Sequence, residues 1–126
     1  MYKQYVNGIE YSARALQDEV KDLPGIPDNV NFKQFSGYVD LPSGNGKVFY
    51  WYVESQNDPD SDPLLWWTNG GPGCSGLSGF LTEQGPFAPN VNLTLGWNLL
   101  SVSLSLDHSH ECYTNKTFSL SLSLSI

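Results

Sequence analysis

The stretch Pro63–Pro86 reads PLLWWTNGGPGCSGLSGFLTEQGP and decides how the chain is organised. Its apolar run, Leu64–Trp67, lies between a proline and the glycine-rich segment Asn69–Gly73, which is typical of a buried strand that enters a loop. Beyond the loop, apolar residues at helical spacing predict a short helix over Cys74–Glu83, which Gly85-Pro86 ends. The stretch therefore predicts a strand, a glycine loop and a helix in succession.

The glycine loop, Asn69–Gly73, suits a site for a negatively charged group. Glycines let the backbone approach a ligand closely, and exposed backbone N–H groups beside a helix N-terminus favour negative charge. A phosphate site is disfavoured because the loop has neither the GxxxxGK[ST] nor the GxGxxG pattern. A plain connecting turn would not need the run NGGPG. We therefore interpret the loop as part of an oxyanion hole of the α/β-hydrolase kind, where such a loop follows an early strand.

The glycine loop belongs to a longer signature. The sequence WWTNGGPGCSG at residues 66–76 is followed by TEQGPF at residues 82–87. Together with further landmarks, these segments resemble the serine carboxypeptidases, secretory-pathway peptidases that work at acid pH and have the α/β-hydrolase fold. The resemblance covers roughly Asp18–Asn98. The further landmarks are Leu23–Gly25, Phe35–Val39, Val48–Ser55 and Gly96–Asn98.

The resemblance implies a fold class and a division of the chain. Because the chain has 126 residues and an α/β-hydrolase sheet needs well over ~200, we expect a truncated α/β-hydrolase with N-terminal strands, glycine loop and short helix. Residues 1–98 are expected to be the N-terminal part of a serine carboxypeptidase domain, with residues 1–17 as a leader or poorly ordered segment. Residues 99–126 form a Ser/Leu-rich tail of low complexity that does not resemble the family, and its structure is left open.

Elements before the loop are also predicted. A short helix is expected over Tyr11–Lys21. Strands are expected over Gln34–Leu41 and Lys47–Ser55, paired antiparallel around the turn Pro42–Gly46. If central strands of the family fold are missing, Leu64–Thr68 would keep an open edge, and we expect self-association through that edge.

The resemblance assigns roles to residues around the glycine loop. The N–H of Gly71 would be one of two oxyanion donors. Asn69 and the N–H of Gly70 would bind the terminal carboxylate of the peptide. Glu83 would share a proton with a second acid and so hydrogen-bond that carboxylate at low pH.

The catalytic triad is not found in these 126 residues. The family uses a serine on a GxSxG elbow, followed by an aspartate and a histidine, and no GxSxG occurs here. His108 and His110 lie in the tail and are not assigned as the base. We expect a serine-type carboxypeptidase sequence that is inactive on its own. Two alternatives stay open, namely a non-catalytic binding or decoy fragment, and a fragment of a related acyltransferase.

Composition limits the partners. The formal net charge of −7 disfavours nucleic acid and anionic membranes, which need a basic patch. No apolar run approaches the ~18 residues of a membrane span. The resemblance implies a peptide C-terminus as substrate, no cofactor, and a lysosomal, vacuolar or extracellular location in the secretory pathway. Met1–Glu10 lacks an apolar core, so no signal peptide is expected there.

The chain also contains two cysteines and two glycosylation sequons. Cys74 is a disulfide candidate: the resemblance implies a bond to a later cysteine, and Cys112 is the other cysteine of the chain. Asn92 and Asn115 each begin an Asn-x-Thr sequon and are glycosylation candidates.

Two metal-site patterns are weak. His108, His110 and Cys112 alternate, so on a strand they share one face, but a fourth zinc ligand cannot be named. The aspartates of the segment 57–63 lack the glycine and glutamate of a calcium loop, so this segment is interpreted as a solvated turn. We expect no metal.

Overall fold

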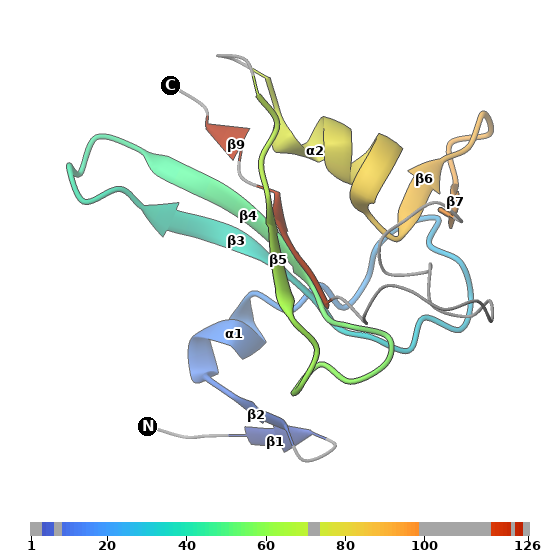
Figure 1. The fold of residues 1–126 in the computed structure, drawn as a ribbon, viewed down its shortest axis with the longest axis horizontal. Coiled ribbons are helices and arrows are strands. Elements are labelled where there is room, and N and C mark those ends of the chain that lie inside the picture. Colours follow the sequence, from blue (N-terminus) through green and yellow to red (C-terminus); the bar gives the residue numbers. More distant parts are fainter. Residues whose placement is uncertain (1–3, 7–8, 71–73, 99–116, 122, 125–126) are drawn as a thin grey trace.

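The computed structural model describes residues 4–6, 9–70, 74–98, 117–121 and 123–124. In this part of the chain, short strands form four small sheets, and the few helical segments are short (Figure 1). The strands are β1 (Gln4–Val6), β2 (Ile9–Tyr11), β3 (Gln34–Asp40), β4 (Lys47–Val53), β5 (Leu64–Trp67), β6 (Phe87–Pro89), β7 (Leu95–Trp97), β8 (Thr117–Ser121) and β9 (Ser123–Leu124). The helical segments are α1 (Ala13–Gln17), α2 (Gly76–Gly79) and the π-helix η1 (Phe80–Gln84).

The hairpin of β3 and β4 is the longest paired element. The strands run antiparallel, with Gln34 opposite Val53 and Asp40 opposite Lys47. Lys47 Nζ and Asp40 Oδ1 also lie 3.1 Å apart near the turn, an exposed ion pair worth at most about 1 kcal/mol. Aromatic and β-branched residues fit this pleated surface. The predicted antiparallel pairing is confirmed.

Strand β5, which leads into the glycine loop, is paired along one edge. It runs parallel to β8, with Leu64 opposite Thr117 and Leu65 opposite Phe118. Strand β9 pairs antiparallel with β4, and β8 lies between β4 and β5 (Figure 1). The prediction of an open edge is therefore wrong for this edge of β5, because the tail contributes a strand there. The structure of the tail was left open, so this pairing was not predicted.

The prediction that Leu64–Trp67 is a buried strand is wrong for half of its side chains. Leu64 is 67% exposed and Trp66 is 57% exposed, whereas Leu65 packs against the core. Successive side chains of a strand point to opposite faces. One face of β5 is therefore packed, and the other is largely uncovered by the described residues.

Helix α1 is shorter than the predicted helix over Tyr11–Lys21. Its start is capped by the Ser12 hydroxyl, which accepts a hydrogen bond from the N–H of Ala15 at 3.1 Å. It ends at Asp18, whose carbonyl accepts the N–H of Ser36 at 2.8 Å. The backbone after α1 thus pairs with β3 in place of continuing the helix, because strand pairing satisfies the same groups.

The core lies between the β3–β4 hairpin and the segment that carries η1 and β6. Phe32, Val53, Phe80 and Phe87 are buried and contact one another as a cluster. The rings of Phe80 and Trp51 stack with their centroids 5.0 Å apart. This contact joins η1 to β4 and so fixes the helical segment after the glycine loop.

The hydroxyl of Tyr50 makes the chain sensitive to alkaline pH. Burial, helped by the hydrogen bond that the hydroxyl donates to Asp18 Oδ2 at 2.6 Å, raises the pKa of Tyr50 to about 12. Nearby Arg14 acts in the opposite direction. The fold favours neutral Tyr50, so its contribution is complete below the ordinary pKa of about 10 and is lost as the pH rises through the folded value. We expect the urea midpoint to fall between about pH 10 and 12.

Tyr50→Phe is the matched variant for this prediction. It should remove one late step from the ultraviolet titration of the tyrosines and weaken the fall of the urea midpoint at alkaline pH. If the titration of the late tyrosines is the same in both proteins, Tyr50 does not have a raised pKa.

Candidate functional site

Asn69 is held in place where β5 ends. Its side-chain oxygen Oδ1 accepts hydrogen bonds from the indole Nε1 of Trp67 at 3.2 Å and from the backbone N–H of Gly79 at 3.3 Å. These two bonds fix which end of the amide faces the protein. The Nδ2 atom, which can donate two hydrogen bonds, forms none with any described residue.

Gly79 leaves room for this arrangement. A Cβ atom at Gly79 would lie 2.6 Å from Oδ1 of Asn69 and 2.8 Å from Nε1 of Trp67. Both distances are too short for real atoms, so any side chain at this position must displace the Asn69 amide. Gly79 was not among the predicted site residues. The only signal for it was its place in the short glycine-rich helix.

The helix predicted over Cys74–Glu83 consists of two segments. The Ser75 hydroxyl caps α2 by accepting the N–H of Leu77 at 3.2 Å, and the π-helix η1 follows without a break. The N–H of Gly85 donates to the carbonyl of Phe80 at 2.8 Å, which is the i→i+5 bond of a π-turn. Such turns often occur at functional sites.

Asn98 stabilises the end of η1. Its Nδ2 donates to the carbonyls of Glu83 at 3.0 Å and Gly85 at 2.9 Å. These carbonyls belong to the last turn, where no intrahelical donor is left for them. Asn98, at the end of β7, therefore fixes the backbone of Glu83, whose side chain is exposed. This contact between residues far apart in sequence was not predicted.

The structure places only some of the predicted site residues. Asn69 is brought against α2, Gly70 is exposed at the start of the loop, and Glu83 lies further along the same helical run. Cys74 is exposed and forms no disulfide with a described residue. Asn92 is exposed on the β6–β7 hairpin. The predictions for Gly71, His108, His110, Cys112 and Asn115 fall outside the described residues.

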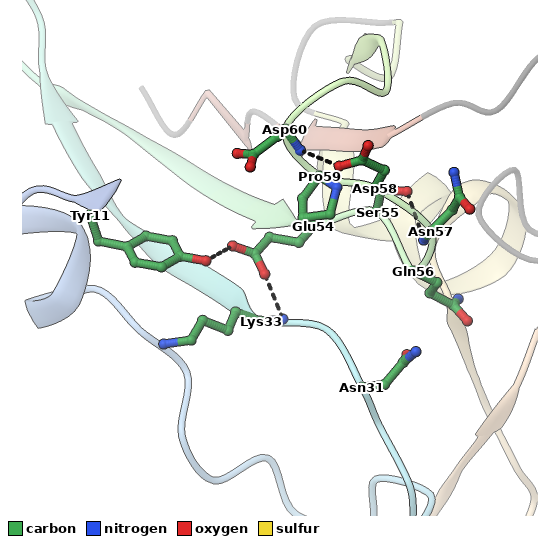
Figure 2. Close-up of a pocket in the computed structure, with 10 residues that line it drawn as sticks. All are labelled: Tyr11, Asn31, Lys33, Glu54, Ser55, Gln56, Asn57, Asp58, Pro59 and Asp60. Atoms are coloured by element: carbon green, nitrogen blue, oxygen red, sulfur yellow. Dashed lines mark hydrogen bonds between the residues drawn. The ribbon is translucent and has the colours of Figure 1, made fainter. Parts of the chain in front are cut away.

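A polar pocket of about 270 Å³ lies where β4 leads into the loop before β5 (Figure 2). Buried Glu54 accepts hydrogen bonds from the Tyr11 hydroxyl at 2.5 Å and from the N–H of Lys33 at 3.0 Å. Burial and the bond to Glu54 raise the pKa of Tyr11. These bonds connect β2 and the segment before β3 with the end of β4. The pocket is lined by Tyr11, Asn31, Lys33, Glu54, Ser55, Gln56, Asn57, Asp58, Pro59 and Asp60.

Several charged groups at this pocket and beside it are bonded within the protein. Lys33 Nζ bonds to Glu19 at 2.8 Å. Asp62 accepts hydrogen bonds from the Ser55 hydroxyl and from the N–H of Asp58, and the Ser55 bond, as the largest cause, lowers the pKa of Asp62. These bonds close the loop that we interpreted as a solvated turn. The hydrogen bonds and the ion pair around the pocket therefore join elements of the fold.

No group of three or more His, Cys, Asp or Glu side chains in the described ranges could hold a metal ion. No helix in the same ranges is long and apolar enough to cross a membrane.

The fold has a solved counterpart. It is similar to the crystal structure of Kex1Δp, a prohormone-processing carboxypeptidase from Saccharomyces cerevisiae, with a TM-score of 0.64 and 26% sequence identity. The match covers 88% of this chain and 24% of that one. Mixed strands with few helices and this neighbour define the class as the α/β-hydrolase fold of the carboxypeptidases.

Sequence comparison then gives the family. The family model described as serine carboxypeptidase matches residues 24–103, and the chain belongs to that family. Lysosomal protective protein of Mus musculus is 47% identical over 98 residues, which are 72% of this chain and 20% of the relative. Serine carboxypeptidase ctsa-3.1 of Caenorhabditis elegans is 51% identical over 77 residues, 60% of this chain and 13% of the relative. The chain thus spans a fifth or less of these relatives.

Proposed function

We propose that this chain supplies one side of the substrate site of a serine carboxypeptidase, which releases the C-terminal residue of a peptide. The observation that carries the proposal is the geometry of Asn69. Its oxygen is held by Trp67 and Gly79, so its Nδ2 is left to bind an acceptor at the end of β5. A peptide carboxylate is such an acceptor, and hydrogen bonds to charged groups are the stronger ones.

The glycine loop completes this side of the site. In the proposal, the N–H of Gly70 binds the same carboxylate as Asn69, and the N–H of Gly71 would donate a hydrogen bond to the oxyanion that forms at the scissile carbonyl. An oxyanion donor contributes about 3 to 4 kcal/mol to transition-state stabilisation once a nucleophile is in place. The loop would therefore both select a free C-terminus and assist its release.

Glu83 would add the dependence on acid pH. Its backbone is fixed by Asn98, and its side chain is exposed. A protonated carboxyl can donate a hydrogen bond to the substrate carboxylate, whereas an ionised one repels it. In the proposal, Glu83 shares one proton with a second acid that comes from outside the segment described above.

These 126 residues contain no GxSxG elbow, so we expect no hydrolysis by this chain alone. In the proposal, residues 1–98 are the carboxypeptidase part, which the family model extends by five residues to position 103, and the rest of the tail lies outside the family sequence. The mouse relative is by its name a lysosomal protein. We propose the same secretory route for this chain.

A chimera tests the proposed role of Asn69. Residues 18–98 would replace the matching segment of the mouse lysosomal protective protein, which is similar to this chain over 98 residues. The chimera should hydrolyse an N-blocked dipeptide. Asn69→Ala should lower kcat/KM by about 10- to 100-fold, because a hydrogen bond to a charged group contributes about 1.5 to 3 kcal/mol.

A substrate without a free carboxylate provides the control. The N-blocked dipeptide amide cannot use the Asn69 donor through a terminal carboxylate, so Asn69→Ala should change its hydrolysis much less. An equal loss on both substrates would show that Asn69 supports only the fold, and no loss on either would remove it from the site.

Gly79→Ala should have a similar selective effect in the chimera. The new methyl group must displace the Asn69 amide, because the Cβ position is 2.6 Å from Oδ1. We expect kcat/KM for the free dipeptide to fall about 10-fold, which corresponds to one weakened hydrogen bond of about 1.4 kcal/mol. Thr82→Ala, an exposed position on the same helical run, is the matched control and should stay near the parent. Equal values for the two variants would contradict the prediction.

A further inference from the structure

The hairpin of β6 and β7 presents an exposed tip that the proposed function does not use. Pro89 pairs with Leu95 at the end of the ladder, and the N–H of Asn90 donates to the carbonyl of Thr94 at 2.8 Å. Beyond this bond, Asn92 is exposed, and the tip stands away from the rest of the fold (Figure 1). An enzyme that modifies the tip would meet it without unfolding the core.

The orientation of the Asn92 side chain is set by hydrogen bonds within its sequon. Its Oδ1 accepts a hydrogen bond from the Thr94 hydroxyl at 2.7 Å, and the N–H of Thr94 lies 3.4 Å from the same oxygen. The Thr94 hydroxyl in turn accepts from Nδ2 of Asn90 at 3.1 Å. The amide oxygen of Asn92 therefore faces the turn. Its Nδ2 has no hydrogen-bond partner among the described residues.

The residues that flank Asn92 are fully accessible too. Val91 and Leu93 have relative exposures of 106% and 94%. Leu93 also has a φ of 63°, a left-handed conformation that costs a residue with a side chain roughly 1 to 2 kcal/mol. A proline at position 93 would abolish the sequon. The positive φ of Leu93 is incompatible with proline, which fixes φ near −65°.

We propose that Asn92 carries an N-linked glycan. In the reaction, Nδ2 of Asn92 attacks the anomeric carbon of an oligosaccharide that is joined to a lipid diphosphate. The new C–N bond forms as the bond from that carbon to the diphosphate oxygen breaks. The amide loses one proton to a base on the transferase, and the lipid diphosphate leaves with the bonding electron pair. The Thr94 hydroxyl orients the amide for this attack by holding Oδ1.

The proposal rests on the secretory route proposed above, because the lipid-linked donor is met there. The experiment therefore supplies that route directly. The full 126-residue chain would be expressed behind a cleavable secretory signal in cultured eukaryotic cells, together with a reporter glycoprotein. Failure at Asn92 would then concern this site alone, and the chimera with the mouse relative would still decide the proposed function.

The readout is the mass of the secreted or membrane-enclosed chain before and after treatment with peptide:N-glycosidase, which converts a glycosylated asparagine into aspartate. Asn115→Gln removes the second sequon, so the remaining glycan must come from Asn92. Thr94→Ala in that background should abolish it, and Thr94→Ser should keep it because the hydroxyl is retained. The two variants differ from each other only by one hydroxyl oxygen, so a difference in glycan between them reports on the hydroxyl at position 94.

Each outcome decides the proposal. Loss of the glycan in Thr94→Ala with retention in Thr94→Ser, and aspartate at position 92 after treatment, supports it. An unmodified Asn92 in the Asn115→Gln chain, with the reporter fully glycosylated in the same cells, overturns it.

Discussion

Gly85→Ala is expected to unfold most of the chain under conditions in which the parent is folded. A Cβ atom at position 85 would lie 2.1 Å from the carbonyl oxygen of Phe80 and 3.0 Å from its Cδ2 atom. The same carbonyl accepts the N–H of Gly85 at 2.8 Å. The methyl group must therefore open the π-turn and push buried Phe80 out of place. We expect a loss of about 3 to 5 kcal/mol from overpacking and the broken bond.

The requirement at Gly85 is for space and not for an unusual backbone. Its φ of −72° and ψ of 165° are open to any residue, so alanine is excluded only by what surrounds it. Gly70 is the matched control, since no atom of the described residues lies within 4 Å of a Cβ atom there. Gly70→Ala should change stability by less than about 0.5 kcal/mol.

Urea unfolding followed by circular dichroism measures both glycine variants. Trypsin digestion gives a second readout, because an open state is cleaved in proportion to its population. If Gly85→Ala and Gly70→Ala unfold at the same urea concentration, the π-turn does not have the geometry described above.

The sequence predicted those parts of the fold that depend on local pattern. The β3–β4 hairpin follows from strand-forming residues on both sides of Pro42–Gly46, and β5 follows from the apolar run before the glycine loop. The helix over Tyr11–Lys21 was predicted too long, because the residues after Asp18 pair with β3. Local propensity gives way here to a contact with a strand that is distant in sequence.

The sequence predicted only some residues of the candidate site. Asn69, Gly70 and Glu83 were found through the resemblance, which points to the residues of a motif. Gly79 and Asn98 were missed because their roles depend on contacts across the fold, with the Asn69 amide and with the carbonyls of η1. A π-helix also has no sequence pattern that separates it from an α-helix. Its bonds are decided by what packs against it.

Phe80→Ala is expected to be the second severe variant. Phe80 is 2% exposed, and its ring stacks on Trp51 with the centroids 5.0 Å apart. Removing a buried phenylalanine side chain leaves a cavity and costs about 3 to 5 kcal/mol. The loss should be large here because Phe80 is the first residue of η1 and connects it to β4. Loss of this contact would also loosen the backbone of η1 at Glu83.

Two further variants separate the cavity from a general effect of losing an aromatic ring. Phe80→Leu keeps most of the apolar volume and should cost less than about 1.5 kcal/mol. Tyr38→Ala removes a ring that is 58% exposed and should cost about 1 kcal/mol or less.

Urea unfolding measures all three variants. The urea midpoints of Tyr38→Ala and Phe80→Leu should lie near that of the parent, and the midpoint of Phe80→Ala should lie far below it. The tryptophan emission of Phe80→Ala should shift to longer wavelength because Trp51 becomes exposed to water. A midpoint for Phe80→Ala close to that of Tyr38→Ala would mean that η1 is not held by the core, and Glu83 could then have no fixed place in the site.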